Sequence, residues 1–223
     1  MPPREIAGPA GRLEAILEEP MPPGTIGHDG RVSAGHPGGL RAAVVFGHPL
    51  TEMGGTMHTK VVYQAAKALS RIGCAVLRFN FRGAGASAGA FDQGIGERDD
   101  FRAAIDDMAA HYPGAPLWAA GMSFGSWVAL TCGAEDPRVT TLLGICPPVA
   151  RYDFGAVERS EKPKFFVHGE FDEICPLRDI KAFYARAAEP KELVVIETAN
   201  HLFEGKVAEV ADAIEDLLGD WSG

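Results

Sequence analysis

The chain lacks the features that mark exported, membrane-bound or nucleic-acid-binding proteins. No apolar run in its 223 residues reaches the roughly 18–20 residues that cross a bilayer, and the N-terminus has no apolar stretch of the signal-peptide type. Acidic residues outnumber basic ones by 30 to 21, and no basic patch marks a phosphate-binding surface. We therefore expect a cytoplasmic protein that partners with neither membrane nor nucleic acid.

Cysteine is also scarce, and the residues present stand too far apart for a Cys-x-x-Cys zinc or redox pair. We expect free thiols at all four positions, which are Cys74, Cys132, Cys146 and Cys175. His-Glu-x-x-His and P-loop patterns are absent from the sequence as well. The sequence therefore indicates no metal site, and we expect no cofactor.

What is present indicates a folded domain. The composition is 46% hydrophobic and 23% charged, which allows a sizeable core and argues against disorder. The length fits one large domain, so we predict a single domain over residues 1–223. A monomer and a homodimer both remain open.

The order of apolar and polar segments predicts the fold class. Alternating stretches at 5–7 and 12–17 predict antiparallel strands at a sheet edge, and the Pro- and Gly-rich segment 20–40 predicts an exposed loop. Further predicted strands cover 42–47, 74–79, 116–120, 139–146, 164–168 and 192–197. Predicted helices cover 57–71, 97–111, 124–135, 177–188 and 204–218.

Buried strands separated by helices form a mostly parallel sheet that is covered on both faces. We therefore predict an α/β protein, a three-layer α/β/α sandwich with an antiparallel N-terminal edge. In such sheets functional residues gather beyond the carboxyl ends of the strands.

A nucleophile motif stands between a predicted strand and a predicted helix. Residues 121–125 read Gly-Met-Ser-Phe-Gly, which is Gly-x-Ser-x-Gly in its required context. A sharp strand-to-helix turn strains the central serine, and the flanking glycines let other backbone pass closely. We predict Ser123 as the nucleophile. The alternative is a serine that caps an ordinary helix.

A serine nucleophile needs a base, and the base needs an orienting acid. Among seven histidines, His201 lies between the last predicted strand and helix, on the same rim as Ser123. His168 ends a strand and is more simply explained as part of the turn that follows. We expect three further histidines at the surface: His28, His36 and His111.

We choose Asp172 as the acid because it follows a buried strand and its short side chain on a tight turn can hold an imidazole firmly. Glu170 and Glu173 are the alternatives. The order serine, aspartate, histidine along the chain is the order of the Gly-x-Ser-x-Gly hydrolases.

Acyl transfer also needs backbone N–H groups directed at the developing oxyanion. The residue after the nucleophile, Phe124, normally supplies one. The second should follow the first central strand, where Pro49 has no N–H, so we choose Leu50 and keep Thr51 as the alternative. His48 would then organise this loop. Segment 47–55 could also be a plain glycine-rich connection.

Several motifs together carry a family resemblance: 48–50 (His-Pro-Leu), 54–57 (Gly-Gly-Thr-Met), 80–87 (Asn-Phe-Arg-Gly-Ala-Gly-Ala-Ser), 121–125 and 168–172 (His-Gly-Glu-Phe-Asp). In this order they resemble the α/β-hydrolase superfamily, and most closely the small bacterial hydrolases related to dienelactone hydrolase. Dienelactone hydrolases carry cysteine as the nucleophile, whereas position 123 is serine, so their substrate is not carried over. The resemblance implies the fold, the serine triad and ester hydrolysis.

The segment between Cys146 and Pro163 is too short for the helical cap domain that many hydrolases of this fold insert there. We expect an open, shallow acyl site flanked by Leu50, Phe124, Pro148 and Tyr152. The predicted activity is hydrolysis of small-molecule esters with short acyl groups through an acyl-enzyme. A thioesterase, a small-peptide or amide hydrolase, and a non-catalytic ligand-binding module of the same fold are the alternatives.

Overall fold

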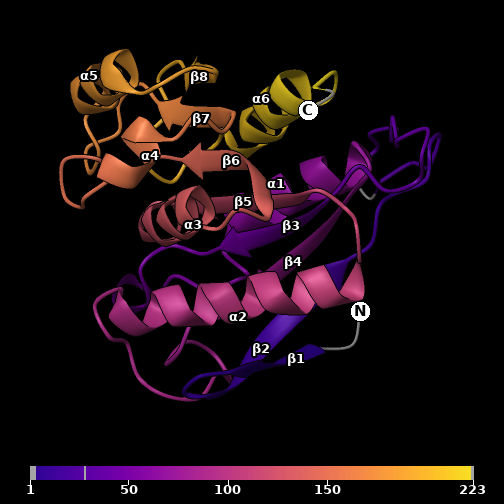
Figure 1. The fold of residues 1–223 in the computed structure, drawn as a ribbon. Coiled ribbons are helices and arrows are strands. Elements are labelled where there is room, and N and C mark those ends of the chain that lie inside the picture. The colour runs from indigo at the N-terminus through magenta and orange to yellow at the C-terminus, as the bar shows by residue number, and fades with distance from the viewer. Residues whose placement is uncertain (1–3, 28, 222–223) are drawn as a thin grey trace.

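An eight-stranded sheet runs through the middle of the molecule in the order β1-β2-β4-β3-β5-β6-β7-β8 (Figure 1). The computed structural model describes residues 4–27 and 29–221, so the prediction for His28 lies outside the described residues. The strands are β1 (Arg4–Gly8), β2 (Gly11–Glu18), β3 (Ala42–Gly47), β4 (Cys74–Phe79), β5 (Leu117–Met122), β6 (Val139–Ile145), β7 (Lys164–Gly169) and β8 (Lys191–Ile196).

The sheet is parallel except at its N-terminal edge. β1 pairs with β2, and β2 with β4, in antiparallel fashion, while every other pairing is parallel. β3, β4, β5 and β7 are buried along their whole length, and β6 is buried except at Thr140. Helices cover both faces of these strands, as their mainly apolar sequences predict.

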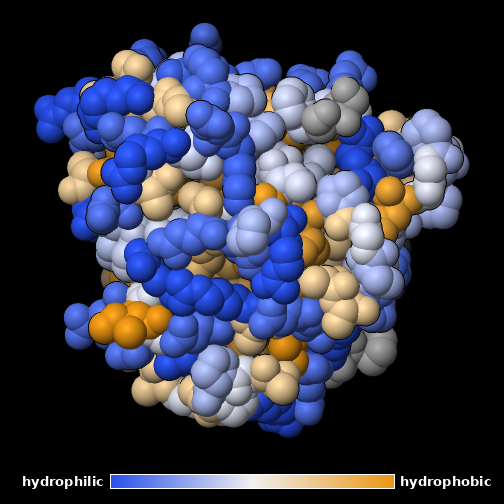
Figure 2. Space-filling view, viewed as in Figure 1, coloured by the Kyte–Doolittle hydropathy of each residue, from blue (hydrophilic) through white to orange (hydrophobic). Residues whose placement is uncertain are grey.

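Helices cover both faces of the sheet, so the predicted three-layer sandwich is confirmed (Figure 1). α1 (Lys60–Arg71) and α6 (Val207–Leu218) pack together on one face. The other face carries α2 (Ile95–His111), α3 (Phe124–Glu135), α4 (Gly155–Arg159) and α5 (Leu177–Arg186). The face drawn in Figure 2 is mainly hydrophilic, with apolar residues in small separate groups.

Three predicted helix starts are corrected. The helix expected from residue 57 begins at Lys60, because the Met57 N–H donates to the side chain of Asn80 instead of entering a helix. The helix expected from 204 begins at Val207, because Gly205 has a φ of 74°, which a right-handed helix does not allow. α2 begins slightly early, at Ile95, with the Glu97 side chain accepting the Gly94 N–H at 2.7 Å.

Two short helices were not predicted, namely η1 (Thr51–Met53) and α4. Between the long elements, segment 20–40 contains no helix or strand among its described residues apart from one bridge between Ile26 and Val32.

All four cysteines are free and buried. Within the described ranges, no helix has the length and apolar composition of a bilayer span.

Candidate active site

Ser123 occupies the sharp turn between β5 and α3 at the carboxyl edge of the sheet. Its φ of 53° and ψ of −124° place it outside the regions that L-residues normally adopt. Its N–H donates to the Ile145 carbonyl at 2.8 Å, which fixes the turn against β6. The strained conformation that the motif predicts is therefore present.

The two motif glycines are required by close backbone contacts. A Cβ atom on Gly121 would lie 2.3 Å from the Gly125 carbonyl oxygen. A Cβ atom on Gly125 would lie 2.3 Å from the His48 carbonyl oxygen, which belongs to the loop after β3. Both distances are far below van der Waals contact, so neither position accommodates a larger residue without movement of the backbone.

A chain of hydrogen bonds links three side chains at this rim. His201 Nε2 lies 2.9 Å from Ser123 Oγ, and His201 Nδ1 lies 2.8 Å from Asp172 Oδ2. Because a carboxylate only accepts, Nδ1 carries the proton and Nε2 is free to accept the serine hydroxyl. The three residues come from the loops after β5, β7 and β8, and each is buried.

The carboxylate of Asp172 is fixed by its own loop. Its Oδ1 accepts the N–H groups of Ile174 at 2.9 Å and Cys175 at 2.7 Å. Burial alone would raise the pKa of Asp172, but the hydrogen bond and charge of His201 and the Cys175 N–H outweigh it, so its pKa lies below the ordinary value. Asp172 is therefore ionised at neutral pH.

The alternative acids contact backbone instead of the imidazole ring. Glu170 accepts the Thr198 N–H at 2.8 Å, and Glu173 accepts the His201 N–H at 3.4 Å. Of the three acidic residues in this loop, the structure places Asp172 against the His201 ring.

Leu50 and Phe124, the predicted oxyanion donors, line one cleft together with Ser123 and His201. Neither the Leu50 N–H nor the Phe124 N–H donates to a protein acceptor in the part of the chain that the structure describes. Thr51, the alternative donor, begins η1 and is not part of the cleft lining.

The cleft has a volume of about 420 Å³, and Pro148 and Tyr152 line its wall. Tyr152 stacks on Trp127 with ring centroids 4.3 Å apart and meets the edge of Phe124. Trp127 was not predicted to contact the site. It lies on α3, one helical turn after Ser123, and this spacing could have indicated that its ring is near the cleft. Trp127 itself does not line the cleft, whereas several residues that do were not predicted, among them Met53, Arg151, Glu173, Ile174 and Leu202.

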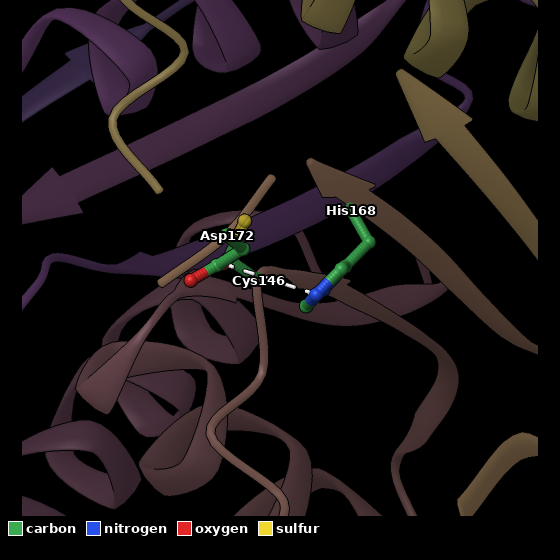
Figure 3. Close-up of side chains that lie close together, drawn as sticks. All are labelled: Cys146, His168 and Asp172. Atoms are coloured by element: carbon green, nitrogen blue, oxygen red, sulfur yellow. Dashed lines mark ion pairs between the residues drawn. The ribbon is translucent and has the colours of Figure 1, made fainter. Parts of the chain in front are cut away.

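Another buried histidine, His168, lies beside Asp172 (Figure 3). His168 is fully buried, with its Nε2 2.7 Å from the Cys175 carbonyl and 3.8 Å from Asp172 Oδ2. Donor atoms of Cys146, His168 and Asp172 lie within 4.8 Å of one another, as do those of Asp172, Cys175 and His201. Burial raises the pKa of the Cys175 thiol to about 12 and that of Cys146 well above its ordinary value, so both thiols are protonated and poor metal ligands.

A strained serine presented at the carboxyl edge of a mostly parallel sheet, with a buried histidine and carboxylate behind it, is the arrangement of the α/β serine hydrolases. Residues 39–155 match the model of the family described as Serine aminopeptidase, S33, and the chain belongs to this family. The match includes Ser123 but ends before Asp172 and His201.

The chain is similar to a curated protein and to solved structures over nearly its whole length. An uncharacterised protein of Rickettsia prowazekii is 36% identical over 227 residues, covering 98% of this chain and 89% of that protein. An α/β serine hydrolase homologue from Coxiella burnetii is 31% identical, with a TM-score of 0.86 over 97% of each chain. An α/β serine hydrolase without a lid from Xanthomonas campestris is 32% identical, with a TM-score of 0.84 over 96% of this chain and 92% of that chain. The relation to dienelactone hydrolase stays a prediction.

Proposed function

We propose that this hydrolase is a carboxylesterase that cleaves small esters with short acyl groups. The observation that carries the proposal is the hydrogen-bonded series Ser123, His201, Asp172, which opens into a cleft of about 420 Å³. A cleft of this size suits a small molecule, and its aromatic and aliphatic wall suits an uncharged acyl chain.

In the proposed reaction, Ser123 Oγ attacks the ester carbonyl while His201 Nε2 accepts the hydroxyl proton. Asp172 stabilises the resulting imidazolium, and the N–H groups of Phe124 and Leu50 hold the oxyanion. The alcohol leaves with the proton from His201. Water, deprotonated by the same histidine, then attacks the acyl-enzyme and releases the acid. None of these steps needs a metal or an organic cofactor.

More than one kind of leaving group is compatible with this series of residues. Thioesters and amides use the same series of residues, and the family description names an aminopeptidase. Amide cleavage depends more strongly on protonation of the leaving nitrogen, so matched substrates with one acyl group and different leaving groups separate these activities.

The test is steady-state hydrolysis of p-nitrophenyl butyrate by the wild type, Ser123→Ala and Ser160→Ala. Ser160 accepts the Lys162 N–H at 3.2 Å and does not line the cleft, so it serves as a control. We expect Ser123→Ala to lose at least about 10³-fold in kcat. We expect Ser160→Ala to match the wild type.

Equal activity in the wild type and Ser123→Ala would contradict the assignment of the nucleophile. Faster Ser123-dependent cleavage of the butyryl thioester or amide would change the substrate class and leave the mechanism in place. Saturable ligand binding without turnover of any of these substrates would favour the binding module.

A further inference from the structure

The imidazole of His48, directly after β3, is fully buried and hydrogen-bonded at both nitrogens. The Phe81 N–H donates to Nε2 at 3.0 Å, and Nδ1 lies 2.6 Å from the Pro49 carbonyl oxygen. Because a backbone N–H only donates, Nε2 must be the acceptor. The neutral ring therefore carries its proton on Nδ1 and donates it to Pro49.

The surroundings keep this ring neutral. Burial lowers the pKa of His48 to about 4, even though the hydrogen bond to Pro49 favours the charged form. At neutral pH the ring is thus a fixed donor toward Pro49 and a fixed acceptor toward Phe81.

The Pro49 carbonyl and the Leu50 N–H belong to one peptide unit. The unit is trans and planar, so its C=O and N–H bonds point in opposite directions. Because the Pro49 carbonyl points at the buried ring, the Leu50 N–H must point away from it. Leu50 lines the cleft beside Ser123, and its N–H has no protein acceptor within the described residues.

Two close contacts limit rotation of this peptide. A Cβ atom on Gly55 would lie 2.2 Å from the Pro49 carbonyl oxygen, so the chain passes against that oxygen from another side. The His48 carbonyl lies against Gly125, which follows Phe124 in the nucleophile turn. The segment 48–50 is therefore packed directly on the element that carries the other proposed oxyanion donor.

We propose that His48 is a positioning residue for the oxyanion hole: its Nδ1–H holds the Pro49 carbonyl and thereby directs the Leu50 N–H at the reacting carbonyl. This inference rests on the proposed function, in which Leu50 stabilises the oxyanion. His48 touches no substrate and acts only through the Pro49–Leu50 peptide.

Two substitutions test the roles of the two ring nitrogens separately. In His48→Asn the side-chain amide takes the place of Nδ1 and can still donate to Pro49. In His48→Gln the amide takes the place of Nε2, can still accept from Phe81, and leaves the Pro49 carbonyl without its donor. Each variant loses one of the two hydrogen bonds, so a purely structural role predicts similar losses in both.

We expect the two variants to differ in kcat. Loss of an oxyanion donor typically costs about 10²–10³-fold, so His48→Gln should lose about 10²-fold and His48→Asn less than about tenfold. KM should change little in either variant, because the oxyanion forms only in the transition state. Gly55→Ala disturbs the same peptide from the other side and should lower kcat with KM unchanged.

Urea unfolding of each variant shows how much of any loss in kcat is due to reduced stability of the fold. Equal kcat losses in His48→Asn and His48→Gln, or a smaller loss in His48→Gln, would overturn the inference while Ser123-dependent hydrolysis still supports the proposed function. If the wild type hydrolyses no ester, the proposed function fails. The inference about His48 is then tested by the rate at which a fluorophosphonate modifies Ser123. The phosphonyl oxygen in that reaction is stabilised by the same N–H groups of Leu50 and Phe124. Modification of His48→Gln as fast as wild type would overturn it.

Discussion

Ser123 holds a backbone conformation that costs a residue other than glycine on the order of 1–3 kcal/mol. The neighbouring glycines and the hydrogen bond to Ile145 hold the residue in this conformation and point its hydroxyl at His201. This strain could be predicted from the sequence because the motif is local. The contact of Gly125 with His48 could not, because it joins two loops that are far apart along the chain.

Two buried histidines make the stability of the fold depend on pH. Burial lowers the pKa of His168, against the opposing effects of the Asp172 charge and the Cys175 carbonyl, and it lowers the pKa of His48 to about 4. The unfolded chain binds a proton on each ring near pH 6.5, whereas the folded protein does so only at lower pH. The free energy of unfolding should therefore fall as the pH decreases from about 6.5 toward 4.

The variant His168→Gln tests this at one site, because glutamine can still donate to the Cys175 carbonyl. Urea unfolding between pH 7 and 5 should give a shallower pH dependence for the variant, by up to about 1.4 kcal/mol per pH unit. An unchanged slope would show that the pKa of His168 is the same in the folded and unfolded protein, which would contradict the effect of burial.

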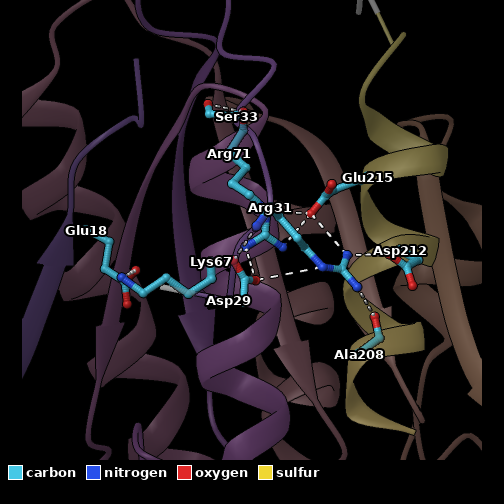
Figure 4. A network of polar contacts seen from close by, with 9 residues as sticks. All are labelled: Glu18, Asp29, Arg31, Ser33, Lys67, Arg71, Ala208, Asp212 and Glu215. Carbon is cyan, nitrogen blue, oxygen red and sulfur yellow. Dashed lines mark hydrogen bonds and ion pairs between the residues drawn. The ribbon is translucent and has the colours of Figure 1, made fainter. Parts of the chain in front are cut away.

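At the scale of elements, a polar network ties the loop 20–40 to two helices (Figure 4). Arg71 of α1 is buried and contacts Glu215 of α6 at 2.7 Å and Asp29 of the loop at 2.9 Å. Arg31, also in the loop, pairs with Asp212 of α6. The hydroxyl of Ser33 donates to the Arg71 carbonyl at 2.8 Å, so loop and helix are joined through side chain and backbone alike.

We expect Arg71→Met to destabilise the protein by about 2–3 kcal/mol, since it removes one partner of a buried pair while Glu215 and Asp29 keep some contact with water. The control is Arg12→Met, which breaks the exposed pair with Glu5 and should cost less than about 1 kcal/mol. Urea unfolding measures both. Equal losses would contradict the anchoring role of Arg71.

Elements with a strong local pattern could be predicted from the sequence. The run 74–79, apolar except for Arg78, coincides with β4, and the alternating residues at 12–17 fall within β2. α4 has five residues, too few for a helical period to show, and η1 has three. The network around Arg71 joins residues far apart in the chain, and no local pattern indicates such pairs.

At the scale of the molecule, the connection between β6 and β7 holds only the short helix α4, which leaves the cleft without a cap domain. Met53 and Leu202 line its wall and are well exposed, so a long acyl chain would pass them into water. A buried methylene contributes about 0.8 kcal/mol, and this gain should stop where the chain leaves the cleft.

We therefore expect kcat/KM for p-nitrophenyl esters to be highest for acetate or butyrate and lower for octanoate. The chain-length series is measured with wild type, with Ser123→Ala as the blank. A steady rise of kcat/KM up to long-chain esters would contradict a small open site.

More of the fold than of the cleft could be predicted from the sequence. The order of strands and helices places the carboxyl ends of β5, β7 and β8 at one edge, so the sequence alone brings Ser123, Asp172 and His201 to one rim. The distances between them, and the stacking of Tyr152 on Trp127, depend on how the loops pack in three dimensions. Residues of the cleft wall such as Arg151 and Ile174 carry no motif and were found only in the structure.

The most direct test of the account is the covalent intermediate on Ser123. The protein is mixed with p-nitrophenyl acetate, quenched in acid within the first turnovers, digested and analysed by mass spectrometry. We expect one acetyl group on the peptide that contains Ser123, absent from Ser123→Ala and lost on longer incubation as water releases the acid. Turnover without this adduct, or with the acetyl group on another residue, would contradict nucleophilic catalysis by Ser123.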